Sequence, residues 1–159
     1  MYYRAVAQNK WLTVISDENY SGDSITGDLR TCGNTLSVWK LDESDNTLID
    51  YYCVITALNR TKIAKVDYVI FDEKDFEKIG IKLNQVDGIC EAFTDDSIKK
   101  NHFDLIEIGY KELGKIAELV HDKIVNNQVK TITIKEIKNK IDSCPYVDKT
   151  KLPNNFFKK

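Results

Sequence analysis

The side chains best suited to bind an anionic ligand gather in the polar segment 17–34. Gly22, Gly27 and Gly33, three of the seven glycines of the chain, lie there with hydroxyl side chains between them. Backbone N–H groups and hydroxyls in such a loop can form an anion-binding nest, and long loops in compact domains are often functional. The candidate binding residues of this predicted loop are Ser24, Thr26, Asp28 and Arg30. A structural hairpin without a binding role explains the same pattern.

Three candidate side chains lie outside that segment. Arg4 stands on a predicted strand, where its guanidinium either pairs with an acid or contacts a ligand. Asp72 follows a predicted central strand at the carboxyl end, where open α/β sheets bind ligands, although helix capping explains it equally well. His102 follows the acidic pair Asp95-Asp96 at the start of a predicted helix, where it could act as a general acid or base or simply lie at the surface.

Familiar catalytic and cofactor motifs are missing from the sequence. It contains neither GxGxxG nor GxxxxGK[ST], the usual nucleotide signatures. The two histidines form no HExxH, and the four cysteines are too far apart for a CxxC pair. We therefore expect four reduced thiols, no metal site and no cofactor, and we assign no catalytic residue. A non-enzymatic role is favoured, although an enzyme stays open.

The charge is unevenly distributed along the chain. The 23 basic and 25 acidic residues give a net charge of −2. Residues 1–98 hold 10 basic and 17 acidic residues (10 − 17 = −7), whereas residues 99–159 hold 13 and 8 (13 − 8 = +5). Two surfaces with different partners would explain this asymmetry, and well-solvated lysine-rich helices are the simpler explanation. The pI of about 5.7 does not favour nucleic-acid binding by the whole protein.

Alternation and helical spacing predict the first half of the fold. Tyr2–Ala7 and Trp11–Ser16 are typical of a hairpin. Thr35–Leu41 predicts a strand, residues 47–59 an amphipathic helix, and Val66–Phe71 a buried strand that a short capped helix follows. This β-α-β-α order indicates a crossover unit within residues 35–80.

The second half is predicted to be mainly helical. Apolar residues advance by 3 or 4 from Phe103 to Ile124, which predicts a long helix over residues 102–126. Thr133 and Glu136 form a capping box for a second helix, residues 134–142. Lysines on that helix (Lys135, Lys138 and Lys140) would contact phosphates if the pair acted as a helix-turn-helix, although it carries no arginine. Residues 81–101 are expected to be irregular.

These patterns together predict one α+β domain over residues 1–145, with an irregular tail over residues 146–159. A mixed sheet would pack against the long helix and the short one. No apolar stretch is long enough for a membrane span and no signal peptide is evident, so a soluble, cytoplasmic protein is expected. The favoured function is binding of a partner protein, as in immunity proteins or antitoxins. The alternatives are a nucleotide-like ligand held by the loop 17–34 and nucleic-acid binding through the basic helices, and a homo-oligomer stays open.

Overall fold

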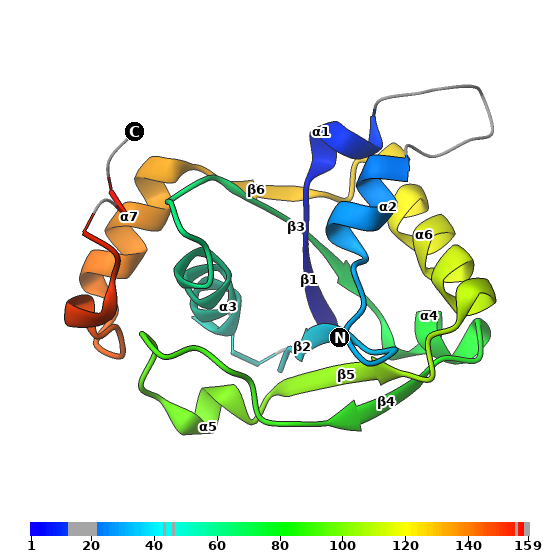
Figure 1. Ribbon diagram of the computed structural model, residues 1–159, viewed down its shortest axis with the longest axis horizontal. Helices are drawn as coiled ribbons and strands as arrows, with labels where there is room; N and C mark the ends of the chain where they lie inside the picture. Colours follow the sequence, from blue (N-terminus) through cyan, green and yellow to red (C-terminus); the bar gives the residue numbers. More distant parts are fainter. Residues whose placement is uncertain (13–21, 43, 46, 155, 158–159) are drawn as a thin grey trace.

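A six-stranded sheet forms the centre of the computed structural model, which describes residues 1–12, 22–42, 44–45, 47–154 and 156–157 (Figure 1). The strand order is β4-β5-β2-β1-β3-β6, and every neighbouring pair runs antiparallel. The strands are β1 (Tyr2–Val6), β2 (Leu36–Lys40), β3 (Val66–Phe71), β4 (Lys82–Gln85), β5 (His102–Ile106) and β6 (Lys130–Ile132). The α+β class is confirmed, whereas the predicted mixed sheet is wrong.

The position of β1 explains why the sheet is antiparallel throughout its described strands. β2 and β3 run in the same direction, and the helix α3 (Thr47–Leu58) connects them, as the β-α-β pattern predicts. β1 lies between these two strands, where Tyr2 pairs with Lys40 of β2 and with Phe71 of β3. Because β1 runs opposite to both neighbours, the two parallel strands never touch.

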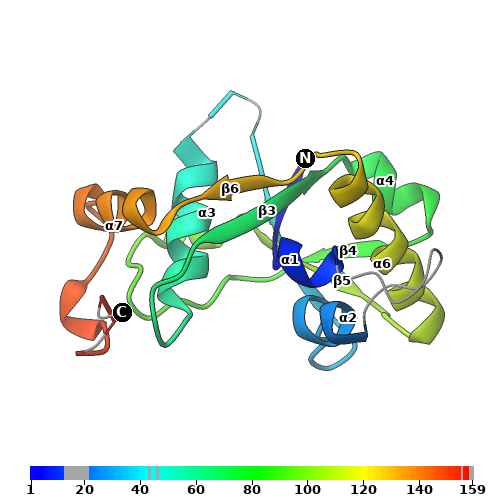
Figure 2. The same cartoon turned by 90° about the horizontal axis from the view of Figure 1, so that it is seen from above.

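Helices cover both faces of the sheet (Figure 1, Figure 2). Successive side chains of a strand point to opposite faces, so Tyr2 and Val6 join the core beneath α4 and α6, whereas Tyr3 joins the core shared with α3 and α7. The remaining helices are α1 (Gln8–Trp11), α2 (Gly22–Asp28), α4 (Glu73–Lys78), α5 (Asp96–Lys99), α6 (Tyr110–Val125), α7 (Ile134–Ser143) and a 3-10 turn (Lys149–Lys151).

The predicted N-terminal hairpin is wrong in its described part. Tyr2–Val6 is a strand as expected, but the chain then turns into α1 rather than into a second strand. Trp11, the predicted start of that strand, ends α1 and is buried in the same core as Leu29. The rest of the predicted strand, residues 13–16, lies outside the described residues.

The predicted helix over residues 102–126 divides into a strand and a shorter helix. Residues 102–106 form β5, and α6 begins only at Tyr110. Glu107 has a φ of 59°, a left-handed conformation that breaks a helix. Within α6 the apolar stripe faces the core from Leu113 onward, with Ile116, Ala117, Val120 and Ile124 buried, while Tyr110 is 92% exposed. Spacing by 3 and 4 through residues 103–110 therefore reflects alternation in a strand followed by a turn.

Several predicted elements are confirmed by the structure. β2, α3, β3 and α4 follow the predicted order within residues 35–80. α7 begins at the predicted capping box, in which the Thr133 amide donates to Glu136 Oε2 at 2.8 Å. It ends at Ser143, shortly before Pro145. The sequence predicts these elements correctly because their local residue patterns favour the same secondary structure that they adopt in the packed fold.

Two segments without a clear sequence signal are more ordered than their composition indicates. Residues 81–101 contain β4 and α5, so the expectation of irregular structure is wrong there. The described residues of the segment 146–157 have no regular element beyond the 3-10 turn, yet Phe156 is fully buried. The Ile63 amide donates to the Phe156 carbonyl at 3.0 Å, which fastens this segment to the core that α3 and α7 share.

Candidate functional site

Arg4 and Asp28 meet at a corner where α1 and α2 join the sheet. Arg4 Nη1 donates to the Ser37 carbonyl at 2.5 Å, and Nη2 donates to the Asp28 carbonyl. The Asp28 carboxylate accepts from the Ala7 amide at 2.5 Å and from Trp11 Nε1 at 2.7 Å. Burial lowers the pKa of Arg4 to about 10, with Asp28 opposing that change. This Arg4–Asp28 corner (Arg4, Ala7, Trp11, Asp28 and Ser37) directs its polar atoms into the chain.

The other candidates from the predicted loop 17–34 belong to α2 or follow it. Residues 22–28 are helical, so the loop prediction is wrong there, and residues 17–21 lie outside the described part. Ser24 is buried, and Thr26 Oγ1 donates to the Gly22 carbonyl one turn back at 2.8 Å. Arg30 is exposed just after the helix. Asp28 links α2 to Arg4, and a ligand role for this group stays a prediction.

Asp72 and His102 are held at separate places. The Asp72 amide donates to the Asp75 carboxylate at 3.0 Å, which caps α4. His102 begins β5 and not a helix, so the predicted helix-end environment is wrong. Its Nδ1 donates to the Val86 carbonyl at 3.1 Å, and its ring lies edge-on to Trp39 at 4.9 Å between centroids. Nε2 lies 3.9 Å from Asp104 Oδ1.

One kind of turn, which the sequence analysis does not predict, occurs four times in the described part of the chain. Two of the four turns directly follow β2. In Asp42-Glu43-Ser44, Asp45-Asn46-Thr47, Asp95-Asp96-Ser97 and Asp148-Lys149-Thr150 the same side-chain pattern recurs. Each aspartate accepts, through Oδ1, the amide and the hydroxyl of the residue two positions later. The Asp-x-Ser/Thr spacing, counted four times, would have revealed these turns.

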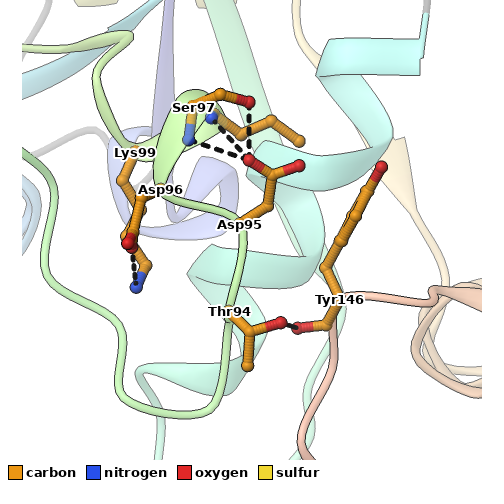
Figure 3. Close-up of polar contacts among 7 residues, drawn as sticks. Thr94, Asp95, Asp96, Ser97, Lys99 and Tyr146 are labelled. Carbon is orange, nitrogen blue, oxygen red and sulfur yellow. Dashed lines mark hydrogen bonds and ion pairs between the residues drawn. The ribbon is translucent and has the colours of Figure 1, made fainter.

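Three of these aspartates, Asp42, Asp45 and Asp95, lie with Asp96 around α5 and the loop that leads into α3; we call these four residues the acidic face. Figure 3 shows Asp95 with Ser97 and the α5 amides bonded to one carboxylate oxygen. The hydrogen bonds from Ser44 and Ser97 lower the pKa of Asp42 and of Asp95. Both carboxyl groups are therefore ionised near neutral pH.

Asp42 and Asp45 of the acidic face line a cavity of about 690 Å³, to which Ser97 and Ile98 contribute from α5, the helix that Asp95 caps. The walls combine carboxylates, amide and hydroxyl groups with apolar side chains (Met1, Lys40, Leu41, Asp42, Asp45, Leu48, Ser97, Ile98 and Asn101). Asp96 pairs with Lys99 at 3.0 Å. Within the described residues, no lysine or arginine forms an ion pair with Asp42, Asp45 or Asp95. Lys40 and Lys99 contribute to the lower pKa of Asp42 and of Asp95, respectively, so these two charges are only partly offset.

The basic half of the chain is arranged differently from a helix-turn-helix. α6 packs on one face of the sheet and α7 on the other, and β6 lies between them in the chain. Lys140 pairs with Asp50 of α3 at 2.6 Å, and Lys138 donates to the Phe157 carbonyl at 3.4 Å. Two of the three lysines proposed for phosphate contacts therefore make contacts within the chain.

The cysteines and the titratable clusters offer little reactive chemistry. Burial raises the pKa of Cys53 to about 12 and also raises the pKa of Cys90, so both thiols are poor nucleophiles. In the part of the chain that the structure describes, no three histidine, cysteine or acidic side chains are arranged to hold a metal ion. Among the same residues, no helix has the length and apolar character needed to cross a membrane.

Comparison of the chain with protein-family models, with curated proteins and with solved structures finds no match in any of the three. The candidate site therefore depends on the geometry and charge of this molecule alone.

Proposed function

We propose that this chain is a non-catalytic interaction module that binds a basic partner protein through the acidic face. The observation that carries the proposal is the state of Asp42, Asp45 and Asp95. Each uses one carboxylate oxygen for a turn within the chain, and none forms an ion pair with a lysine or arginine among the described residues. Small proteins that neutralise a toxic partner, such as immunity proteins and antitoxins, are the class that this arrangement fits.

The turns give the acidic face a fixed arrangement of charge. Because the Ser44, Thr47 and Ser97 amides hold the three carboxylates, little side-chain freedom remains to be lost on binding. Unneutralised charge of one sign also accelerates encounter with a partner of opposite sign. Lysine or arginine side chains of a partner would supply donors to the carboxylate oxygens that the turns leave unused.

Several acidic residues elsewhere in the molecule pair with lysines. Asp50 pairs with Lys140 at 2.6 Å, and Asp75 pairs with Lys123 at 3.3 Å. These two contacts join the acidic first half of the chain to its basic second half. Three of the four acidic-face residues form no such pair among the described residues, which favours an external partner as their counter-charge.

The nucleotide-binding alternative depends mainly on the loop 17–34 together with Arg4 and Arg30. Both terminal nitrogens of Arg4 and the Asp28 carboxylate already bond within the chain, although the buried Arg4 Nε has no hydrogen-bond partner. Protein binding through the acidic face is therefore the better supported function.

The test compares two triple variants that remove the same charge. In D42N/D45N/D95N each amide keeps the oxygen that accepts the turn hydrogen bonds, so the fold is expected to persist. In E77Q/E118Q/D122N three exposed acids of α4 and α6 lose their charge on the other face of the sheet. The probe is a fluorescent peptide of alternating lysine and serine, and its binding is followed by anisotropy.

The acidic-face variant is expected to bind the peptide about 10-fold more weakly than the control variant, with the gap narrowing as salt rises. Equal loss in both variants would mean that net charge alone attracts the peptide, and it would overturn the proposal. Co-expression with the product of each adjacent gene then identifies the natural partner, whose binding is expected to respond to the same three substitutions.

A further inference from the structure

We infer that the loop 86–91 is the apolar anchor of the same interface and that it receives a basic amphipathic segment of the partner. This inference rests on the proposed function and adds the chemistry of the bound segment. Val86 is 38% exposed and Ile89 is 84% exposed, so one short loop presents two large aliphatic side chains to solvent. Isolated exposed apolar residues are common, whereas a pair on one loop beside a cavity points to a contact surface.

The loop is held firmly despite its exposed side chains. The Val86 amide donates to the His102 carbonyl at 3.3 Å, and His102 Nδ1 donates back to the Val86 carbonyl at 3.1 Å. The Gly88 amide donates to the Lys99 carbonyl at 2.9 Å, and Asn59 Nδ2 donates to the Ile89 carbonyl at 3.3 Å. An apolar side chain on a loop fixed in this way loses little entropy when a partner covers it.

The loop 86–91 and the acidic face lie on either side of α5, which contributes residues to a cavity beside each of them. A cavity of about 510 Å³ separates the loop from that helix and is lined by Gly88, Ile89 and Cys90 together with charged residues (Asp87, Glu91, Asp96, Lys99 and Lys100). On its other side α5 contributes Ser97 and Ile98 to the larger cavity that Asp42 and Asp45 line. One bound segment can therefore contact both cavities across a single short helix.

Charge complementarity selects the kind of segment. Asp87 and Glu91 border the cavity beside Ile89 and form no ion pair among the described residues. Asp96 is already paired with Lys99, and Lys100 also lines the cavity. An amphipathic segment would place its apolar side on Val86 and Ile89 and its lysine or arginine side chains on the surrounding carboxylates. Recognition of a helix through an apolar stripe is a recurrent mode of peptide binding.

Two peptides of equal charge separate the anchor from the acidic face. One has lysine and leucine at helical spacing, and the other has the same lysines with serine in place of leucine. The variants are Ile89→Ala and, as a matched control, Ile134→Ala, which truncates an exposed isoleucine of α7. Thermal unfolding verifies that both variants fold, because neither side chain lies in the core.

The wild-type chain is expected to bind the lysine–leucine peptide about 10-fold more tightly than the lysine–serine peptide, even at high salt. Ile89→Ala should remove most of that preference, and Ile134→Ala should keep it. Equal affinity for the two peptides, or the same result in both alanine variants, overturns the anchor. The proposed function is judged separately, because it fails if D42N/D45N/D95N weakens binding of the lysine–serine peptide no more than the control triple variant E77Q/E118Q/D122N does.

Discussion

The Arg4–Asp28 corner and the acidic face use the same kinds of side chain for different ends. At the corner, the Asp28 carboxylate accepts from a main-chain amide and an indole, and Arg4 donates to two carbonyls. At the acidic face, Asp42 and Asp95 each accept the turn hydrogen bonds through one carboxylate oxygen. The second oxygen of each carboxylate accepts no hydrogen bond from a lysine or arginine among the described residues. The partners of each polar atom, rather than residue type, distinguish this cluster from the proposed binding surface.

The largest effect on stability is expected at the corner. Asp28→Ala leaves the Ala7 amide and Trp11 Nε1 without their acceptor, which should lower the free energy of unfolding by about 2–3 kcal/mol. Denaturant titration measures the change. Asp23→Ala, an exposed residue of the same helix, is the control and should alter stability by less than about 0.5 kcal/mol. Equal, small effects would show that the corner is not a structural cluster.

A second substitution tests the support of the loop beside the acidic face. A Cβ at Gly88 would lie 2.3 Å from Trp39 Cη2 and 3.1 Å from His102 Cβ, so Gly88→Ala should destabilise the fold by about 1–3 kcal/mol. Gly114 of α6 has open space around the same position, and Gly114→Ala should stabilise by up to about 1 kcal/mol. Thermal unfolding of the two variants should therefore shift in opposite directions. An unchanged unfolding temperature for Gly88→Ala would mean that the loop shifts to make room for the methyl group at little cost in stability.

Replacing the Arg4 guanidinium by an ammonium group is expected to lower the free energy of unfolding by less than the two changes above. Arg4→Lys keeps the charge but cannot donate to the Ser37 and Asp28 carbonyls at once, and a loss of about 1–2 kcal/mol is expected. Arg60→Lys is the matched control, because Arg60 makes an exposed bond to the Lys65 carbonyl at 2.8 Å. That control should change stability by less than about 0.5 kcal/mol. A loss of similar size in both variants would assign no special role to the corner.

The smallest effect concerns the acid dependence of the acidic face. The pKa of Asp95 in the folded chain lies below the usual 3.8, so its ionised form stabilises the fold fully above that value. The contribution is lost as the pH falls through the lower pKa of the folded state. Asp95→Asn should therefore cost less than about 1 kcal/mol at neutral pH, and the difference from wild type should shrink toward about pH 3. If the stability difference between Asp95→Asn and wild type instead increased as the pH falls, the pKa of Asp95 would be raised by folding and not lowered, and this prediction would be wrong.

The sequence predicted those elements whose local signals were strong. The strand Val66–Phe71 has continuous apolar character, and Thr133 with Glu136 marks the start of α7. β4 escaped notice because an edge strand with one buried face needs few apolar residues, and Leu83 is the only apolar residue in it. Residues 102–110 were assigned to the wrong element because a strand plus a turn can imitate helical spacing.

The candidate site was harder to predict than the fold. Arg4 and Asp28 are 24 positions apart and are both predicted binding residues, and no local pattern predicts that they contact each other. Asp42 and Asp45 lie beside Ser97 and Ile98 of α5 because the end of β2 and this helix are neighbours in space, and no local pattern reports that proximity. The repeated Asp-x-Ser/Thr turn was visible in the sequence, but its relation to a cavity was not.

The position of β1 between two strands that follow it has a consequence for folding order. During synthesis β1 can pair on one edge only after β2, which contains Lys40, has been made. Its other edge can pair only after β3, which contains Phe71, has been made. Pairing across such long sequence separations slows folding, because the loop entropy is lost before the contacts form. Until β3 is complete, β1 exposes an unpaired edge rich in tyrosine and valine, which is a site for non-native pairing with other chains. The yield of correctly folded protein should therefore depend more on expression temperature and rate than the modest size of the chain indicates.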